Sequence, residues 1–143
     1  MKHIEIINGP NLNLTGRREP DIYGRVTMEE MVADLRSRFP EAEIGYYQSN
    51  VEGEIINRLQ EVGFTAEGII LNAGGYSHTS VALHDALAAV PAPAIEVHLS
   101  NIFSREEYRH HSLLTSACRG IICGLGLKGY KLALNALLTD SKK

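Results

Sequence analysis

The stretch AEGIILNAGG, residues 66–75, decides the fold class because its apolar residues follow one another without a polar alternation. A strand that is buried on one face alternates apolar and polar side chains, whereas a strand inside a parallel sheet is covered on both faces and is apolar throughout. The stretch closes with Asn72 and two glycines, which are typical of a turn after a strand. We therefore predict an inner strand of a parallel sheet here.

Other short strand patterns occur along the chain, and helical patterns separate them. The first helix carries a capping box, since Thr27 is followed three residues later by Glu30. Alternating strands and helices predict the α/β class, as a flavodoxin-like five-stranded parallel sheet with helices on both faces, in a single domain over residues 1–143. The predicted strands are 3–8, 42–49, 66–75, 92–101 and 119–126, the predicted helices are 27–39, 52–63, 78–90 and 127–140, and residues 104–112 form a polar loop or short helix.

Composition sets limits on the kind of protein. The chain has 143 residues, of which 44% are hydrophobic and 22% charged, and a net charge of −3, so we expect neither long disorder nor a surface for nucleic acid or anionic membranes. No apolar run has the length of a signal peptide or a membrane span, which predicts a cytoplasmic protein. Cys118 and Cys123 lack metal-ligand spacing and are expected to stay reduced, and the six histidines form no i,i+4 pair, so no metal is expected.

Polar side chains follow three of the predicted strands, at the point where each strand ends. Ligands of open parallel sheets bind at this edge, so these side chains are candidates for a site. The alternative is that they serve as caps and turns, which we favour for Asn8 and Thr79. The candidates are Asn11 after the first strand, Asn72 and His78 after the third, and Glu96, His98 and Ser100 at the end of the fourth.

Glu96 and His98 are two residues apart in a strand, so their side chains point to the same side. A carboxylate beside an imidazole fixes its tautomer and stabilises its protonated form, which suits a general acid. The alternative, a satisfied His–Glu pair in the interior, stays open at this point.

The loop GRREPDIYG, residues 16–24, has no apolar face and holds Arg17, Arg18 and Tyr23 between two glycines. Tyrosine is a poor base at neutral pH, and a neighbouring guanidinium, which keeps its charge, favours the phenolate. The glycines are plausible hinges of a lid. The segment therefore suggests a tyrosine base that is activated by arginine, and the alternative is a solvated basic loop in which Tyr23 packs on a neighbour.

Together these motifs resemble the type II 3-dehydroquinate dehydratases, also called type II dehydroquinases. The resemblance runs through NGPNLNLTGRREPDIYG (8–24), NAGGYSHTS (72–80), IEVHLSNIFSREEYRHHS (95–112) and GIICGLGLKGY (120–130). It implies the removal of water from 3-dehydroquinate to give 3-dehydroshikimate, by anti elimination through an enolate, in the shikimate pathway or in quinate breakdown. It also implies no cofactor, and a homo-oligomer that is typically a dodecamer of trimers.

The resemblance assigns roles residue by residue. Tyr23 matches the base, Arg18 the arginine that keeps it ionised, and His98 the acid that protonates the departing hydroxyl. Other matched positions are Asn11, which holds a water against the enolate oxygen, Glu96, which orients His98, the substrate-binding positions Asn72, His78 and Arg109, the backbone of Leu99 and Ser100 in a carboxylate pocket, and Asp85, which reaches the site of a neighbouring subunit.

Lysine placement argues against an imine mechanism, because the chain has no lysine between Lys2 and Lys128. The ketone would then be activated by hydrogen bonds instead of a Schiff base. Two competing interpretations remain: a flavodoxin-like module that binds an anion or a flavin at the glycine turn before a helix, without catalysis, and a purely structural oligomer.

Overall fold

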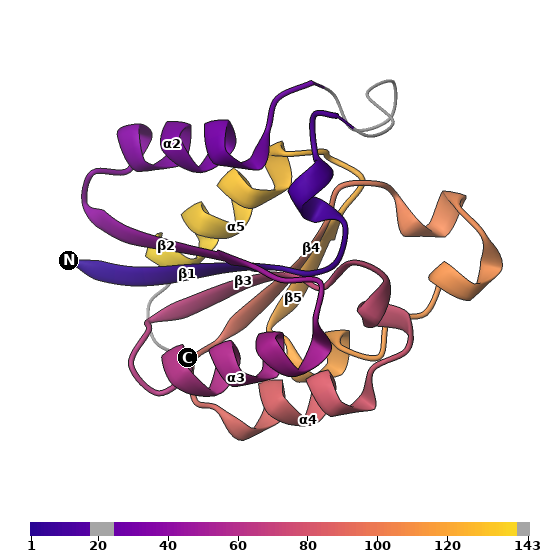
Figure 1. Cartoon of the computed structure of the whole chain (residues 1–143). Helices are drawn as coiled ribbons and strands as arrows, with labels where there is room; N and C mark the ends of the chain where they lie inside the picture. Colours follow the sequence, from indigo (N-terminus) through magenta and orange to yellow (C-terminus); the bar gives the residue numbers. More distant parts are fainter. Residues whose placement is uncertain (18–24, 140–143) are drawn as a thin grey trace.

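The computed structural model describes residues 1–17 and 25–139, which form one parallel sheet with helices on both faces (Figure 1). The strand order is β2-β1-β3-β4-β5 and all neighbouring pairs are parallel. This confirms the predicted α/β class with five parallel strands. The strands are β1 (Lys2–Asn8), β2 (Ala42–Gln48), β3 (Gly68–Asn72), β4 (Ala94–His98) and β5 (Gly120–Cys123), and the α-helices are α2 (Met28–Arg38), α3 (Glu52–Val62), α4 (Val81–Ala89) and α5 (Lys128–Thr139).

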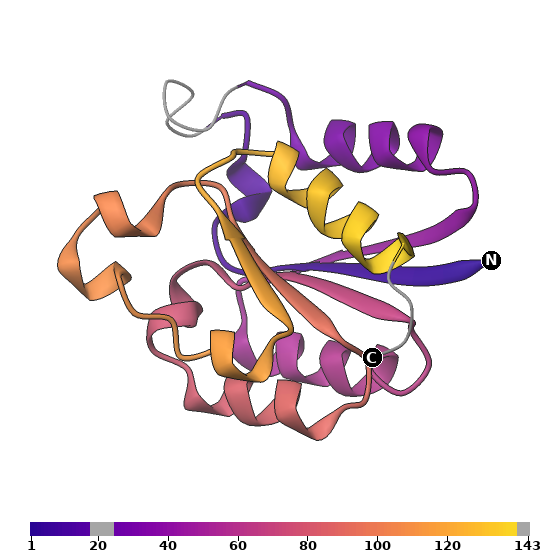
Figure 2. The same ribbon diagram turned by 180° about the vertical axis from the view of Figure 1, so that it is seen from behind.

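Two apolar cores lie on opposite faces of the sheet. Helices α2 and α5 cover one face and helices α3 and α4 cover the other, as both views show (Figures 1 and 2). Successive residues of an inner strand alternate between the cores, so Ile6 packs under α2 and α5 whereas Ile7 packs under α3 and α4. This double coverage is the reason that the inner strands have no polar alternation.

Several elements are shorter than predicted, including β4 and β5, which occupy Ala94–His98 and Gly120–Cys123 instead of 92–101 and 119–126. The helix predicted over 78–90 begins at Val81, because the Ser80 hydroxyl caps it by accepting a hydrogen bond from the Leu83 amide, and residues 74–78 form a 3₁₀ turn instead. The strand predicted over 66–75 is confined to Gly68–Asn72. The capping box of Thr27 and Glu30 is present as predicted.

Gly63 ends helix α3, although not in the left-handed conformation that glycine usually provides at this position. Its φ is −67°, which any residue adopts. A Cβ atom at Gly63 would lie 2.5 Å from the carbonyl oxygen of Leu59 and 2.5 Å from Cβ of Val90. Glycine is therefore required here by the close approach of the segment after α4.

A buried ion pair lies on the α3 face of β1, in the middle of that strand. The carboxylate of Glu5 is fully buried, and its Oε2 accepts hydrogen bonds from Arg58 Nη2 at 2.6 Å and Nε at 3.0 Å. His3 Nε2 lies 2.9 Å from the other oxygen. Both carboxylate oxygens are thus matched, which offsets the cost of burying the charge.

We expect Arg58→Ala to lower the free energy of unfolding by about 3 kcal/mol, since it leaves the Glu5 charge buried without its main partner. Arg38→Ala is the matched control, because its pair with Asp34 is exposed, with 57% of each side chain accessible, and should cost no more than about 0.5 kcal/mol. Urea unfolding of both variants measures the difference. Equal losses would show that burial of the Glu5 pair makes no contribution.

Within the described ranges, no helix combines the length and the apolar character that crossing a bilayer demands.

Candidate active site

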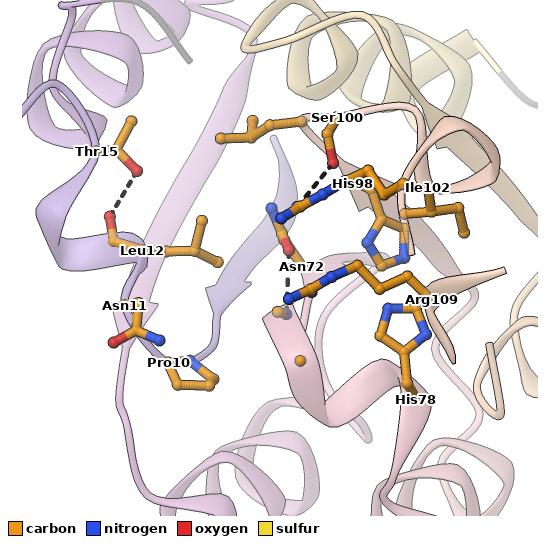
Figure 3. A pocket seen from close by; sticks show the side chains of 14 residues that line it. Pro10, Asn11, Leu12, Thr15, Asn72, His78, His98, Ser100, Ile102 and Arg109 are labelled. Atoms are coloured by element: carbon orange, nitrogen blue, oxygen red, sulfur yellow. Dashed lines mark hydrogen bonds between the residues drawn. The ribbon is translucent and has the colours of Figure 1, made fainter. Parts of the chain in front are cut away.

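A pocket of about 160 Å³ opens at the carboxyl edge of the sheet, between the loops that follow β1, β3 and β4. Pro10, Asn11 and Leu12 lie across the pocket from His78, His98 and Arg109 (Figure 3). The register of the strands explains the convergence, because Asn8 at the end of β1 pairs directly with Asn72 at the end of β3. The edge predicted from the ends of the strands is thus the edge that carries the pocket.

His98 and Glu96 form a buried pair on the face of β4 that is turned toward α4. The distance between His98 Nε2 and Glu96 Oε2 is 2.5 Å, and the two side chains are 6% and 0% exposed. The prediction that both point to the same side of the strand is confirmed. Only His98 also lines the pocket, so its ring connects a buried carboxylate to the space where a ligand can bind. This arrangement suits proton donation to a bound molecule.

His78 supports the ring of His98 from the neighbouring loop. The two ring centroids lie 6.0 Å apart with an interplanar angle of 25°. His78 Nδ1 lies 2.9 Å from the carbonyl oxygen of His111, which fixes the orientation of its ring. Both imidazoles line the pocket.

Asn72 is held by a buried hydrogen-bond chain. Its Nδ2 donates to the hydroxyl of Tyr130 at 2.9 Å, and that hydroxyl donates to Asn8 Oδ1 at 2.8 Å. The Asn72 Oδ1 accepts from the Gly74 amide at 3.2 Å. Burial raises the pKa of Tyr130 above its ordinary value, so the hydroxyl stays protonated and keeps donating. The amide of Asn72 therefore has one defined orientation at the pocket wall.

Tyr130→Phe is expected to lower the free energy of unfolding by about 1–3 kcal/mol, because it leaves the buried amides of Asn72 and Asn8 with an unsatisfied donor and acceptor. Urea unfolding measures the loss. The control is Tyr76→Phe, whose exposed hydroxyl donates to the carbonyl of Asn50 and should matter much less. If Tyr130→Phe is as stable as the parent protein, the hydrogen bonds through the Tyr130 hydroxyl do not fix the Asn72 amide.

Two arginines, Arg105 and Arg109, bring positive charge to the pocket wall. Arg109 Nε donates to Glu106 at 3.0 Å, and Arg105 Nη1 donates to the hydroxyl of Ser100 at 3.3 Å. Hydrogen bonds from its own backbone amide and from the Tyr108 hydroxyl lower the pKa of Glu106 to about 2, so it is an anion at neutral pH. Guanidinium groups bind carboxylates with two parallel hydrogen bonds, so this wall suits an anionic ligand.

Asn11 has a φ of 70°, the one positive value among the described residues other than glycine. Asparagine tolerates this left-handed region better than most residues. The backbone N–H of Asn11 donates to the Oδ1 atom of Asn50 at 3.0 Å, which supports the turn. Asn11 lines the pocket. Its left-handed backbone conformation would be unfavourable for most other residues.

The structure brings together most of the residues that the sequence predicted. Glu96 lies directly behind His98, whereas Asp85 lies on α4, 74% exposed and near His84, and does not line the pocket of its own chain. Arg18 and Tyr23 lie outside the described residues. The predicted residues that line the pocket are Asn11, Asn72, His78, His98, Leu99, Ser100 and Arg109.

Arg105 lines the pocket beside Arg109 and was not among the predicted site residues. Its signal was available, since it lies four residues before Arg109 in the polar segment that follows β4. The apolar residues Leu12 and Ile102 also line the pocket and were not predicted, since the sequence has no distinctive pattern around them.

Comparison with known proteins identifies the family of the chain. The family model described as dehydroquinase class II matches residues 2–138. A curated relative from an Exiguobacterium species, named 3-dehydroquinate dehydratase, is 52% identical over 136 residues, which cover 94% of this chain and 93% of the relative.

Solved structures of type II dehydroquinases have the same fold. The protein from Butyrivibrio crossotus is 45% identical, covers 96% of this chain and 98% of its own, and has a TM-score of 0.92. The protein from Propionibacterium acnes is 42% identical, covers 98% of each chain and has a TM-score of 0.93. The predicted resemblance is thereby confirmed. The chain belongs to the class II dehydroquinase family and is a hydro-lyase.

Proposed function

We propose that the protein converts 3-dehydroquinate to 3-dehydroshikimate by anti elimination through an enolate. Tyr23 removes a proton from C2, beside the ketone, and the electron pair moves onto the ketone oxygen to form the enolate. When the enolate collapses, the C1 hydroxyl departs with a proton from His98 and leaves as water. The activity named for the relatives and the family match support the reaction. The role of Tyr23 rests on the resemblance of the segment PDIYG, residues 20–24.

The observation that carries the proposal is the buried Glu96–His98 pair opening onto a small pocket. An imidazole that is backed by a carboxylate and faces a ligand is suited to protonate a poor leaving group such as hydroxide. Arg18 keeps Tyr23 ionised, and Asn11 holds a water against the enolate oxygen. Substrate is bound by Asn72, His78 and Arg109 and by the backbone of Leu99 and Ser100, and neither a metal nor an organic cofactor takes part.

The test is turnover of 3-dehydroquinate by purified, chelator-treated protein, followed by the ultraviolet absorbance of the conjugated product. A parallel reaction contains borohydride, which would trap an imine. Turnover that survives both treatments supports an elimination without metal or imine. Absence of turnover in folded protein would contradict the proposal and favour a binding module for an anion or a flavin.

The proposal includes a role in the shikimate pathway and a cytoplasmic location. A strain that lacks its own dehydroquinase requires aromatic amino acids, and expression of this chain should remove that requirement. Continued growth dependence despite turnover in vitro would argue against the biosynthetic role.

We also propose a homo-oligomer, a dodecamer of trimers, in which Asp85 reaches the pocket of a neighbouring copy. The support is local: Asp85 is exposed on α4, beside a hollow whose apolar lining includes Val81 and Phe103, which are 62% and 59% exposed. Exposed apolar groups around a hollow are typical of a surface that another protein covers.

Asp85→Ala is expected to raise KM about tenfold while the unfolding temperature of the assembly stays within a few degrees, because the carboxylate would contact substrate across the interface. Light scattering gives the mass of the assembly and steady-state kinetics give KM. A monomer in solution, or an unchanged KM in an intact oligomer, would contradict this assignment.

A further inference from the structure

Two hydroxyl groups from the segment between β4 and β5 reach back to the buried carboxylate of Glu96. Ser112 Oγ donates to Oε2 at 2.6 Å, and Thr115 Oγ1 donates to Oε1 at 2.5 Å. His98 Nε2 lies 2.5 Å from Oε2 as well. Each carboxylate oxygen therefore has its own hydroxyl donor, in addition to the imidazole.

The donors are held in place by the backbone around them. Ser112 Oγ accepts a hydrogen bond from the Leu114 amide at 3.2 Å, which leaves its own proton directed at Glu96. The Leu113 amide donates to the carbonyl of Ser77 at 2.7 Å and ties the segment to the loop after β3. Thr115 begins a 3₁₀ turn beside α4. The hydroxyls are thus preorganised in the fold and need no ligand to adopt this arrangement.

The charge state of Glu96 follows from the groups that face it. Burial by itself would raise the pKa of Glu96, but hydrogen bonds from His98, Ser112 and Thr115 outweigh it and hold the pKa below the ordinary value. Among the residues that the structure describes, the other titratable side chain that faces Glu96 is Cys118, before β5. Burial raises the pKa of the Cys118 thiol to about 12, so it carries no charge at neutral pH. His78 is one step further away, stacked on His98.

We propose that Ser112 and Thr115 are positioning residues of the dehydratase reaction, which hold the Glu96 carboxylate ionised and aimed at His98. The inference rests on the proposed function, because it concerns the residue assigned as the acid. With both donors present, the proton between Glu96 and His98 stays on the imidazole, which can pass its other proton to the leaving group. Without them, the proton moves toward Glu96, and a neutral imidazole is a much weaker acid.

The first test uses Thr115→Val, which is nearly isosteric but lacks the hydroxyl, together with Ser112→Ala and the double variant. A hydrogen bond to a charged group corresponds to roughly one pKa unit. We expect each single change to lower kcat about tenfold. The acidic limb of the kcat–pH profile should move upward by about one pH unit, since Glu96 then becomes protonated at higher pH. KM should change less than about twofold, because neither residue lines the pocket.

Thr115→Ser is the matched control, since it keeps the hydroxyl and should retain the parent pH profile. A lower kcat with an unmoved acidic limb in Thr115→Val would overturn the inference and indicate a purely structural role. If Ser112→Ala does not fold, Thr115→Val and Thr115→Ser still decide the question.

A second readout does not depend on turnover. Infrared difference spectra on acidification show the carbonyl band of a protonated carboxylic acid, and Glu96→Gln identifies the band that belongs to Glu96. The band should appear at higher pH in Thr115→Val than in the parent protein. If the band moves but the parent protein shows no turnover, the proposed function is wrong, while the effect of the Ser112 and Thr115 hydroxyls on Glu96 is supported. If the parent protein turns over and the band does not move, only the inference about Ser112 and Thr115 is wrong.

Discussion

Replacing His98 with asparagine is expected to lower kcat by about 10²-fold to 10⁴-fold, which is the range for loss of a general acid. Asparagine retains a polar side chain of similar reach but cannot deliver a proton to the departing hydroxyl. The ring also fills the space between Glu96 and the pocket, so the variant loses some packing, and thermal unfolding should accompany the kinetics.

The role of His98 can be separated from general damage by following hydrogen exchange at C2 of 3-dehydroquinate in D₂O. An enolate forms before the hydroxyl leaves, so exchange at C2 should persist in His98→Asn while product formation stops. His111→Asn, at an exposed histidine, is the matched control and should turn over normally. Loss of exchange together with turnover would remove His98 as the acid of the second step.

Replacing Tyr23 with phenylalanine should also lower kcat by about 10²-fold to 10⁴-fold, but for the opposite reason. The base is lost, so neither exchange at C2 nor product formation should occur, whereas ligand binding and the unfolding temperature should stay close to those of the parent protein. The pair of variants thus assigns the two proton transfers to two residues by one measurement.

Arg18→Ala tests how Tyr23 acts as a base. If the Arg18 guanidinium keeps the Tyr23 phenolate ionised, Tyr23 should lose its proton only at higher pH in this variant. The pH at which kcat is half-maximal should then rise. A slowed enzyme with an unchanged pH profile would show that Arg18 positions Tyr23 instead of promoting its ionisation. Full activity of Tyr23→Phe would overturn both assignments.

Several features of the site follow from the sequence because they depend on local periodicity. A two-residue repeat within a strand places Glu96 and His98 on one side, and the structure has them in contact. Parallel strands end at one edge, so Asn72 and Asn11 could be assigned to the same site before the register was known. Local signals also predict the start of α2, where Thr27 and Glu30 cap each other.

Other features depend on segments that are far apart in the chain. Tyr130 reaches Asn8 across a separation of 122 residues, and Thr115 reaches Glu96 across 19. No local pattern predicts which hydroxyl reaches which carboxylate, since the partners meet only when the sheet has formed. The predicted start of α4 at residue 78 was also wrong, because Ser80 is the N-cap and the helix begins at Val81.

The sequence alone determined the class of the fold, the family, and the edge of the sheet at which the pocket lies. Each of these depends on apolar runs, turns and short motifs, which are formed by residues that are neighbours in the sequence. Only the tertiary structure determined the contacts within the site. These are the hydrogen bonds from Ser112 and Thr115 to Glu96, the orientation of the Asn72 amide, and the position of Arg105 beside Arg109 at the pocket. The physical reason is that a hydrogen bond within a buried network has its geometry and strength set by burial and by partners from distant segments. Those partners are fixed by the packing of the whole chain.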